Sequence, residues 1–145
     1  MAEATLAWVD TAGFNDAVRA ALVASHRAIW ERSFDPRLFE LVRVRIAQLL
    51  RCDAELRFRA PESVAAGVDE ALLAALAGWP TSDRFDERDR VVLGWVEQWV
   101  LDVKGISDDQ AARVQEQFSD AELAQLTLAL ASFEAAIRAR TALGV

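Results

Sequence analysis

The side chains best suited to chemistry lie between residues 40 and 59. Cys52 is the only cysteine of the chain; Glu40 comes twelve positions before it, and Glu55 and Arg59 follow it by three and seven positions. A thiol can act as a nucleophile, a carboxylate can move protons and an arginine can bind an anion. One cysteine cannot form an internal disulfide, and with one histidine it cannot form a common Cys/His zinc site. We therefore expect chemistry without a metal or other cofactor.

The local charge around Cys52 is mixed. A helix is predicted from Cys52 to about residue 60, because Pro61 disfavours helical backbone at the residue before it. A thiol in the first turn of a helix feels the positive end of the helix dipole, and Arg51 adds a positive charge; both favour the thiolate. Asp53 and Glu55 act in the opposite direction, so the two influences compete.

Glu40 belongs to the preceding helix, predicted at residues 36–50 with Asp35 as its N-cap. Apolar residues occupy several sides of this helix, so we expect it to be central and buried on most faces, and Arg43 must then find partners or solvent. In an unbroken helix, Glu40 and Cys52 would lie about 18 Å apart, at roughly 1.5 Å per residue. A site shared by the two therefore needs a bend before Cys52 or a second subunit.

Helical patterns fill the rest of the chain after an irregular lead-in at residues 2–13. Ser107 with Gln110, and Ser119 with Glu122, form capping boxes that mark two helix starts. Further helices are expected at about residues 16–33, 69–77, 86–103, 108–117 and 120–142. Because no strand pattern or internal repeat is present, we predict an all-α bundle of six or seven helices in a single domain, residues 1–145.

Two sets of residues on these helices have both a structural and a functional interpretation. His26 is isolated on its helix, so a packing or surface role is favoured over general-base chemistry. Trp95 and Trp99 lie one turn apart in an apolar stripe. A place in the core is favoured for them over a ligand pocket or an oligomer interface.

The overall charge narrows the classes of partner. The net charge is −7 and the pI is near 4.7, and no basic stripe is present, which disfavours a nucleic-acid surface. The first residues carry neither a basic cluster nor a long apolar run. These features predict no signal peptide, no membrane span and a cytoplasmic location.

The spacing of Glu40 and Cys52 resembles the signature Glu-x11-Cys-x2-Cys-x3-His of the alkylhydroperoxidase D-like branch of the carboxymuconolactone decarboxylase family. Glu55 stands in place of the second cysteine and Arg59 in place of the histidine. Relatives often carry an Asn-Gly type turn before the first cysteine, where this chain has Leu50-Arg51. Three segments are similar to family blocks and occur in the family's order: residues 35–52, 82–100 and 118–144.

The resemblance implies an all-helical, homo-oligomeric protein. It also implies an oxidoreductase with peroxiredoxin-type antioxidant activity, in which a cysteine pair reacts with the peroxide while a glutamate and a histidine relay protons. By position, Cys52 takes the place of the first cysteine and Glu40 that of the relay carboxylate. Glu55 cannot attack a peroxide, so such an activity would use Cys52 alone, with an external thiol reductant to resolve its sulfenic acid. Arg59 would stabilise the thiolate and Glu40 would move a proton.

Two alternatives compete with this hypothesis. A non-redox decarboxylase or isomerase-like enzyme could bind a small carboxylic acid through Arg59 while Glu40 or Glu55 handles a proton. A catalytically inactive oligomeric binding protein would instead use Trp95, Trp99 and the alanine-rich last helix as interfaces. For Cys52 itself, a place as a small buried hydrophobe is favoured over a reactive thiol. For the charged residues, a solvated Glu55–Arg59 pair one helical turn apart, or a fixed Glu40–Arg59 salt bridge, is favoured over a catalytic site.

Overall fold

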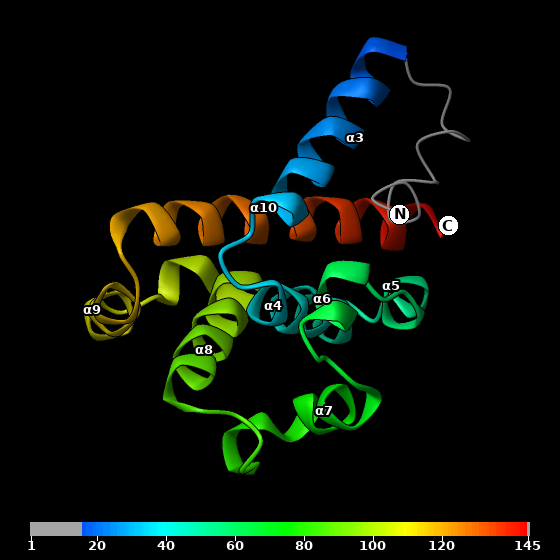
Figure 1. The fold of residues 1–145 in the computed structure, drawn as a ribbon. Coiled ribbons are helices and arrows are strands. Elements are labelled where there is room, and N and C mark those ends of the chain that lie inside the picture. Colours follow the sequence, from blue (N-terminus) through cyan, green and yellow to red (C-terminus); the bar gives the residue numbers. More distant parts are fainter. Residues whose placement is uncertain (1–15, 145) are drawn as a thin grey trace.

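The computed structural model describes residues 16–144, and helices joined by short connections make up this part of the chain (Figure 1). The α-helices are α3 (Asp16–Glu31), α4 (Pro36–Leu49), α5 (Asp53–Arg57), α6 (Pro61–Ala65), α7 (Glu70–Ala75), α8 (Glu87–Asp102), α9 (Asp108–Gln117) and α10 (Asp120–Leu143). Two 3-10 helices, η1 (Leu76–Thr81) and η2 (Val103–Gly105), follow α7 and α8. The predicted all-α class is confirmed, while the lead-in at residues 2–13 lies outside the described residues.

Local hydrogen bonds explain where the longer helices begin. The side chain of Asp35 accepts a hydrogen bond from the backbone N–H of Leu38 at 3.0 Å and so caps α4. The predicted capping boxes at Ser107 and Ser119 are both present, at the starts of α9 and α10. A third capping box, formed by Asp86 with Asp89, starts α8.

Helix α4 lies at the centre of the molecule and contacts α5, α6, α8 and α10. Nine of its residues are buried, which confirms the expectation that this helix is covered on most faces. Its buried apolar side chains are Leu38, Phe39, Leu41, Val42, Val44, Ile46 and Ala47. A leucine-to-alanine change among them is expected to cost about 2–5 kcal/mol of stability.

The segment after Cys52 is more broken than the sequence predicted. Helix α5 ends at Arg57, and Phe58 is extended, with φ −81° and ψ 146°. Pro61 does not only stop a helix; it is the first residue of α6, where its missing N–H costs no hydrogen bond. Ala60 before it is extended, the backbone favoured for a residue that precedes proline.

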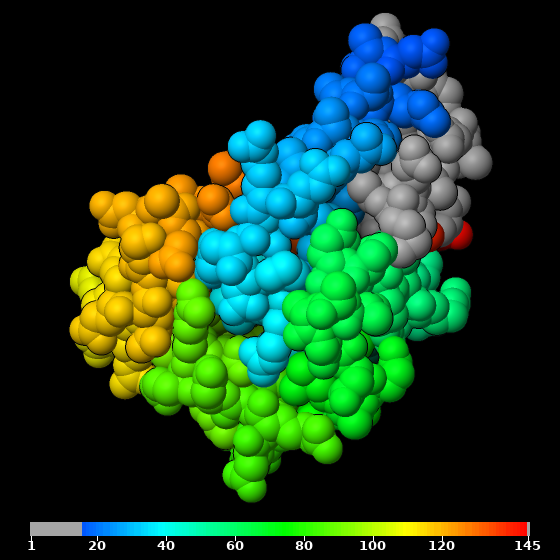
Figure 2. All heavy atoms as spheres, in the orientation of Figure 1, coloured from blue at the N-terminus to red at the C-terminus, as the bar shows by residue number. Residues whose placement is uncertain are grey.

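Helix α3 projects from the body and reaches it mainly across α10 (Figures 1 and 2). Its two buried residues are His26 and Trp30, whose rings pack against Phe133 of α10 at centroid distances of 6.0 and 5.5 Å. The packing role favoured for His26 therefore agrees with its position. None of the described helices combines the length and apolarity that a bilayer span requires.

Candidate functional site

A tight turn separates Cys52 from the helix that carries Glu40. Arg51 has a φ of 54°, in the left-handed region, and its N–H donates to the carbonyl of Gln48 at 3.3 Å. The N–H of Cys52 donates to the carbonyl of Ala47 at 2.9 Å. These two bonds form a Schellman motif, the usual end of a helix, although glycine is the usual residue where Arg51 stands. The bend that a shared site requires is thus present without an Asn-Gly turn.

Cys52 is the N-cap residue of α5 and is almost fully buried, with 5% of its surface exposed. It lines an open pocket of about 300 Å³ at the end of α10. Three of the other side chains in the wall are arginines and one is an aspartate; the full set is Arg51, Asp53, Ala54, Arg57, Arg140, Thr141 and Gly144. The thiol therefore faces a small space with an excess of positive charge.

Arg43 organises the charged residues behind this pocket. Its guanidinium group is fully buried and donates to both carboxylate oxygens of Glu40, at 2.9 and 2.8 Å. It also donates to the Oε2 atom of Glu55 at 2.8 Å, and to the backbone carbonyls of Glu55 and Phe58 at 3.0 and 2.9 Å. All five donated bonds are between buried or half-buried groups, the arrangement that a charge inside a protein requires.

Arg140 extends the same network to the thiol pocket. Its Nη1 atom donates to the Oε1 atom of Glu55 at 2.7 Å, and its side chain is 14% exposed. Glu55 thus accepts bonds from two guanidinium groups and is itself fully buried. Because Arg140 is also in the pocket wall beside Cys52, the buried carboxylate of Glu55 holds a positive charge against that pocket.

Arg59 pairs with neither Glu40 nor Glu55 and touches this network only at the backbone carbonyl of Phe58, which corrects two predictions. Its guanidinium group donates to both carboxylate oxygens of Glu70, at 2.7 and 2.9 Å, on the surface, and this hydrogen bonding raises the pKa of Arg59. The predicted Glu55–Arg59 pair does not form, because α5 ends at Arg57 and the chain is no longer helical at Arg59. The predicted Glu40–Arg59 bridge does not form either, because Arg43 occupies both oxygens of Glu40.

The structure therefore brings together only part of the predicted set. Glu40 and Glu55 meet through Arg43, and Cys52 meets Glu55 through Arg140. The pairing of Arg43 with Glu40 could have been inferred from the sequence, since Arg43 lies three residues after Glu40 on a helix expected to be buried. The part played by Arg140 could not, because it lies on a different helix far along the chain.

The described residues hold no group of three or more His, Cys, Asp or Glu side chains arranged to bind a metal ion. Both carboxylate oxygens of Glu40 and of Glu55 accept a hydrogen bond from a guanidinium group.

Comparisons of the sequence and the fold with known proteins identify the family of this chain. No match was found among curated proteins. Among solved structures, the chain is similar to a protein of unknown function from Agrobacterium tumefaciens, provisionally described as the antioxidant defence protein AhpD, with a TM-score of 0.72, 23% identity and 85% of each chain covered. At that identity the likeness shows the fold. The model of the carboxymuconolactone decarboxylase family matches residues 16–98, more than half of the chain. The chain therefore belongs to the carboxymuconolactone decarboxylase family, with an AhpD-like all-α fold.

Proposed function

We propose that the protein reduces hydroperoxides through Cys52 alone. The observation that carries this proposal is the position of Cys52 in the wall of an open pocket that also contains Arg51, Arg57 and Arg140. The thiolate is the reactive form of cysteine, and neighbouring cations favour it over the neutral thiol. The same cations can bind the oxygen atoms of a peroxide as negative charge develops on them.

The chemistry requires no second cysteine in the chain. The Cys52 thiolate attacks one oxygen of ROOH, the O–O bond breaks, and the leaving alkoxide takes a proton to give ROH and a sulfenic acid on Cys52. Two molecules of an external thiol then reduce the sulfenic acid: the first forms a mixed disulfide and releases water, and the second releases Cys52 and a disulfide. The cytoplasm, which keeps thiols reduced, is the compartment we propose for it.

The other residues of the predicted site take no direct part in the reaction. Glu55 holds Arg140 beside the pocket, and Arg43 holds Glu55 and Glu40 in place from the opposite side. Glu40 is assigned no proton transfer, because both of its oxygens accept bonds from Arg43. Arg59 is assigned no part in the reaction, because it pairs with Glu70 at the surface.

The experiment that tests this proposal measures the consumption of cumene hydroperoxide with dithiothreitol as reductant. Wild-type protein is compared with Cys52→Ser, and the sulfenic acid is trapped with dimedone and detected by mass spectrometry. Arg59→Gln is the matched control, since it removes an arginine that lies outside the pocket. Turnover that is lost in Cys52→Ser and kept in Arg59→Gln is the expected result. Equal background rates in the wild type and Cys52→Ser would overturn the proposal.

A second function fits the same pocket: binding of a small carboxylic acid, as in a non-redox enzyme of the family. The three arginines of the pocket wall favour it, because a guanidinium group matches the geometry of a carboxylate. Saturable binding of a carboxylate that is unchanged in Cys52→Ser, without any hydroperoxide turnover, would select this function. Binding that is followed by no reaction would indicate a protein that only binds.

We also propose that the chain forms homo-oligomers through α3 and α10. Val18 and Leu22 lie one turn apart on α3 and are 44% and 39% exposed, and Leu128 on α10 is 70% exposed. A hollow of about 440 Å³ lies where the two helices meet, with Ile29 and Leu128 in its wall. A second copy that packs here would cover apolar surface that the described part of one chain leaves in water.

Sedimentation velocity tests this assembly. Leu128→Asp is expected to lower the mass in solution, whereas Leu101→Asp, an equally exposed leucine on α8 (68%), is expected to leave it unchanged. A wild-type protein that stays monomeric at every concentration would contradict the proposal.

A further inference from the structure

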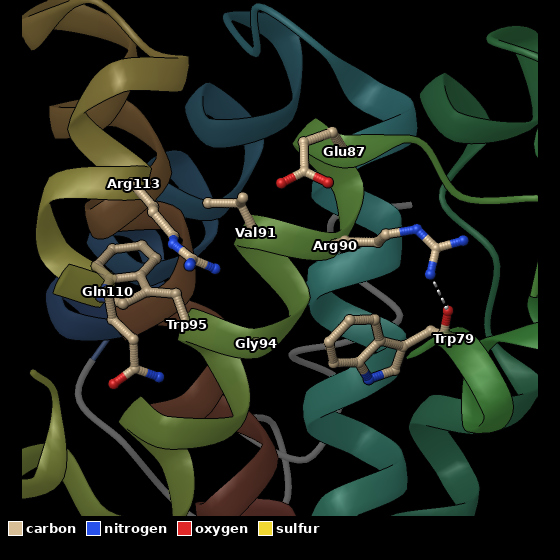
Figure 3. A pocket seen from close by; sticks show the side chains of 8 residues that line it. All are labelled: Trp79, Glu87, Arg90, Val91, Gly94, Trp95, Gln110 and Arg113. Atoms are coloured by element: carbon tan, nitrogen blue, oxygen red, sulfur yellow. Dashed lines mark hydrogen bonds between the residues drawn. The ribbon is translucent and has the colours of Figure 1, made fainter. Parts of the chain in front are cut away.

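A second pocket lies on the other side of the molecule's centre, between η1, α8 and α9 (Figure 3). Its volume is about 290 Å³, and it shares no residue with the wall of the Cys52 pocket. Pockets for small molecules combine apolar and aromatic walls with a few polar groups, and this volume suits a small ligand. The wall consists of Trp79, Glu87, Arg90, Val91, Gly94, Trp95, Gln110 and Arg113.

Two fixed indole rings form its sides, with Gly94 between them (Figure 3). Trp79 is held by its Nε1 atom, which donates to Glu97 at 2.6 Å. Trp95 packs edge to face against Trp99 at a centroid distance of 5.6 Å. A Cβ atom at Gly94 would lie 3.6 Å from the Trp79 ring, so the missing side chain leaves the floor of the pocket open. The indoles therefore offer preformed apolar faces to a flat group.

The pocket also contains two charges of opposite sign that are available to a ligand. Arg90 is not one of them, because its guanidinium group donates to backbone carbonyls of η1 and of the loop between η1 and α8. Glu87 and Arg113 form no hydrogen bond or ion pair with any other residue in the range 16–144. They reach the pocket from opposite sides, with Val91 between them (Figure 3).

We propose that this pocket binds a small zwitterion with a flat apolar body, of the class of the aromatic α-amino acids. The ligand's carboxylate pairs with Arg113, its ammonium group pairs with Glu87, and its ring lies between Trp79 and Trp95. Arginine is the residue best matched to a carboxylate, and an ammonium group needs an anionic partner. The arrangement makes recognition depend on both charges, because a ligand with only one leaves the other residue without a partner.

The test is a titration with L-phenylalanine, followed by the indole N–H signals in ¹H–¹⁵N NMR spectra. We expect the signals of Trp79 and Trp95 to move while that of Trp30, which is buried against Phe133, stays in place. 3-Phenylpropionate lacks the ammonium group and 2-phenylethylamine lacks the carboxylate. Each is expected to bind about tenfold more weakly, the loss of one charge-assisted contact.

Matched variants assign each charge. Arg113→Gln is expected to remove the preference for phenylalanine over phenylethylamine, and Glu87→Gln the preference over phenylpropionate. Arg84→Gln, an exposed arginine outside the pocket, is expected to change neither. Cys52→Ser is expected to bind phenylalanine as the wild type does, which separates this site from the peroxide chemistry. Absence of shifts at Trp79 and Trp95, or equal affinity for the three compounds, would overturn the proposal.

Discussion

The Nη1 atom of Arg140 lies 2.7 Å from the Oε1 atom of Glu55, although the two residues are 85 positions apart in the sequence. Glu55 is fully buried, and its other carboxylate oxygen is bonded to Arg43. One carboxylate thus fixes two guanidinium groups, and only one of these reaches the pocket of Cys52. Glu55, in the place of the second cysteine of the family signature, is the link between the core and that pocket.

Replacing Glu55 with glutamine should destabilise the fold strongly. The change leaves the buried guanidinium of Arg43 and the half-buried one of Arg140 with one carboxylate less, and such a loss costs about 3–5 kcal/mol of unfolding free energy. Urea denaturation measures the effect. Glu70→Gln is the matched control, because Glu70 also pairs with an arginine but lies at the surface. A loss as small as that of the control would contradict the assigned role of the buried network.

Replacing Arg140 with glutamine should slow the reaction of Cys52 with iodoacetamide at neutral pH. The change removes one positive charge from the pocket wall, and partly exposed charges at such sites are worth about 0.2–1 kcal/mol, or roughly a 1.4- to fivefold lower rate. Arg140→Lys should retain more of the rate because the charge stays. An alkylation rate that is unchanged in Arg140→Gln would show that the thiol does not sense this arginine.

Replacing Arg51 with glycine should raise stability while it lowers reactivity. Arg51 has a left-handed backbone that costs a residue with a Cβ atom about 1 kcal/mol, and glycine avoids most of this cost. The same change removes a guanidinium group from the pocket of Cys52. Thermal unfolding and iodoacetamide kinetics on one sample measure both effects. A fall in melting temperature would show that contacts of the Arg51 side chain outweigh its backbone strain.

The stability of the fold should fall as the pH drops through the range between about 6.5 and about 4. Burial, and then the charge of Arg43, lower the pKa of His26 from 6.5 to about 4, and its buried Nε2 atom has no hydrogen-bond partner among residues 16–144. Between those values the unfolded chain binds a proton that the folded chain does not, so acid favours unfolding, by roughly 3 kcal/mol at the limit.

His26 is the only histidine of the chain, which makes the test direct. Unfolding free energies of the wild type and His26→Leu are compared at several pH values, because the carboxylates titrate in both proteins. The wild type should lose more stability in acid than His26→Leu does. Parallel curves would mean that His26 has an ordinary pKa in the folded protein.

Local features of the sequence were sufficient to predict most of the helices. Capping at Asp35, Ser107 and Ser119 depends on residues within one turn, so the starts of these helices were predicted correctly. The segment after Cys52 was not, because the early end of α5 follows from contacts with Arg43. Its guanidinium group binds the backbone carbonyls of Glu55 and Phe58, and a sequence pattern does not contain such contacts.

The candidate site shows the same division. A site shared by Glu40 and Cys52 requires a bend before Cys52, and the sequence does not reveal where the chain bends. The residue with left-handed backbone is Arg51 rather than the glycine that marks such turns. The pairing of Glu55 with Arg140 could not be inferred from sequence spacing. Arg140 lies on α10 and reaches Glu55 only when the helices pack together. Tertiary packing thus determines which of the charged side chains form pairs.

The distance along the chain between Glu55 and Arg140 also has a consequence for synthesis on the ribosome. A ribosome adds about 5–20 residues per second, so Arg140 is made on the order of 10 s after Glu55. During that interval α4 and α5 can meet, but the carboxylate of Glu55 has only Arg43 to neutralise it. Glu55 therefore gains its second guanidinium partner only after α10 has been synthesised.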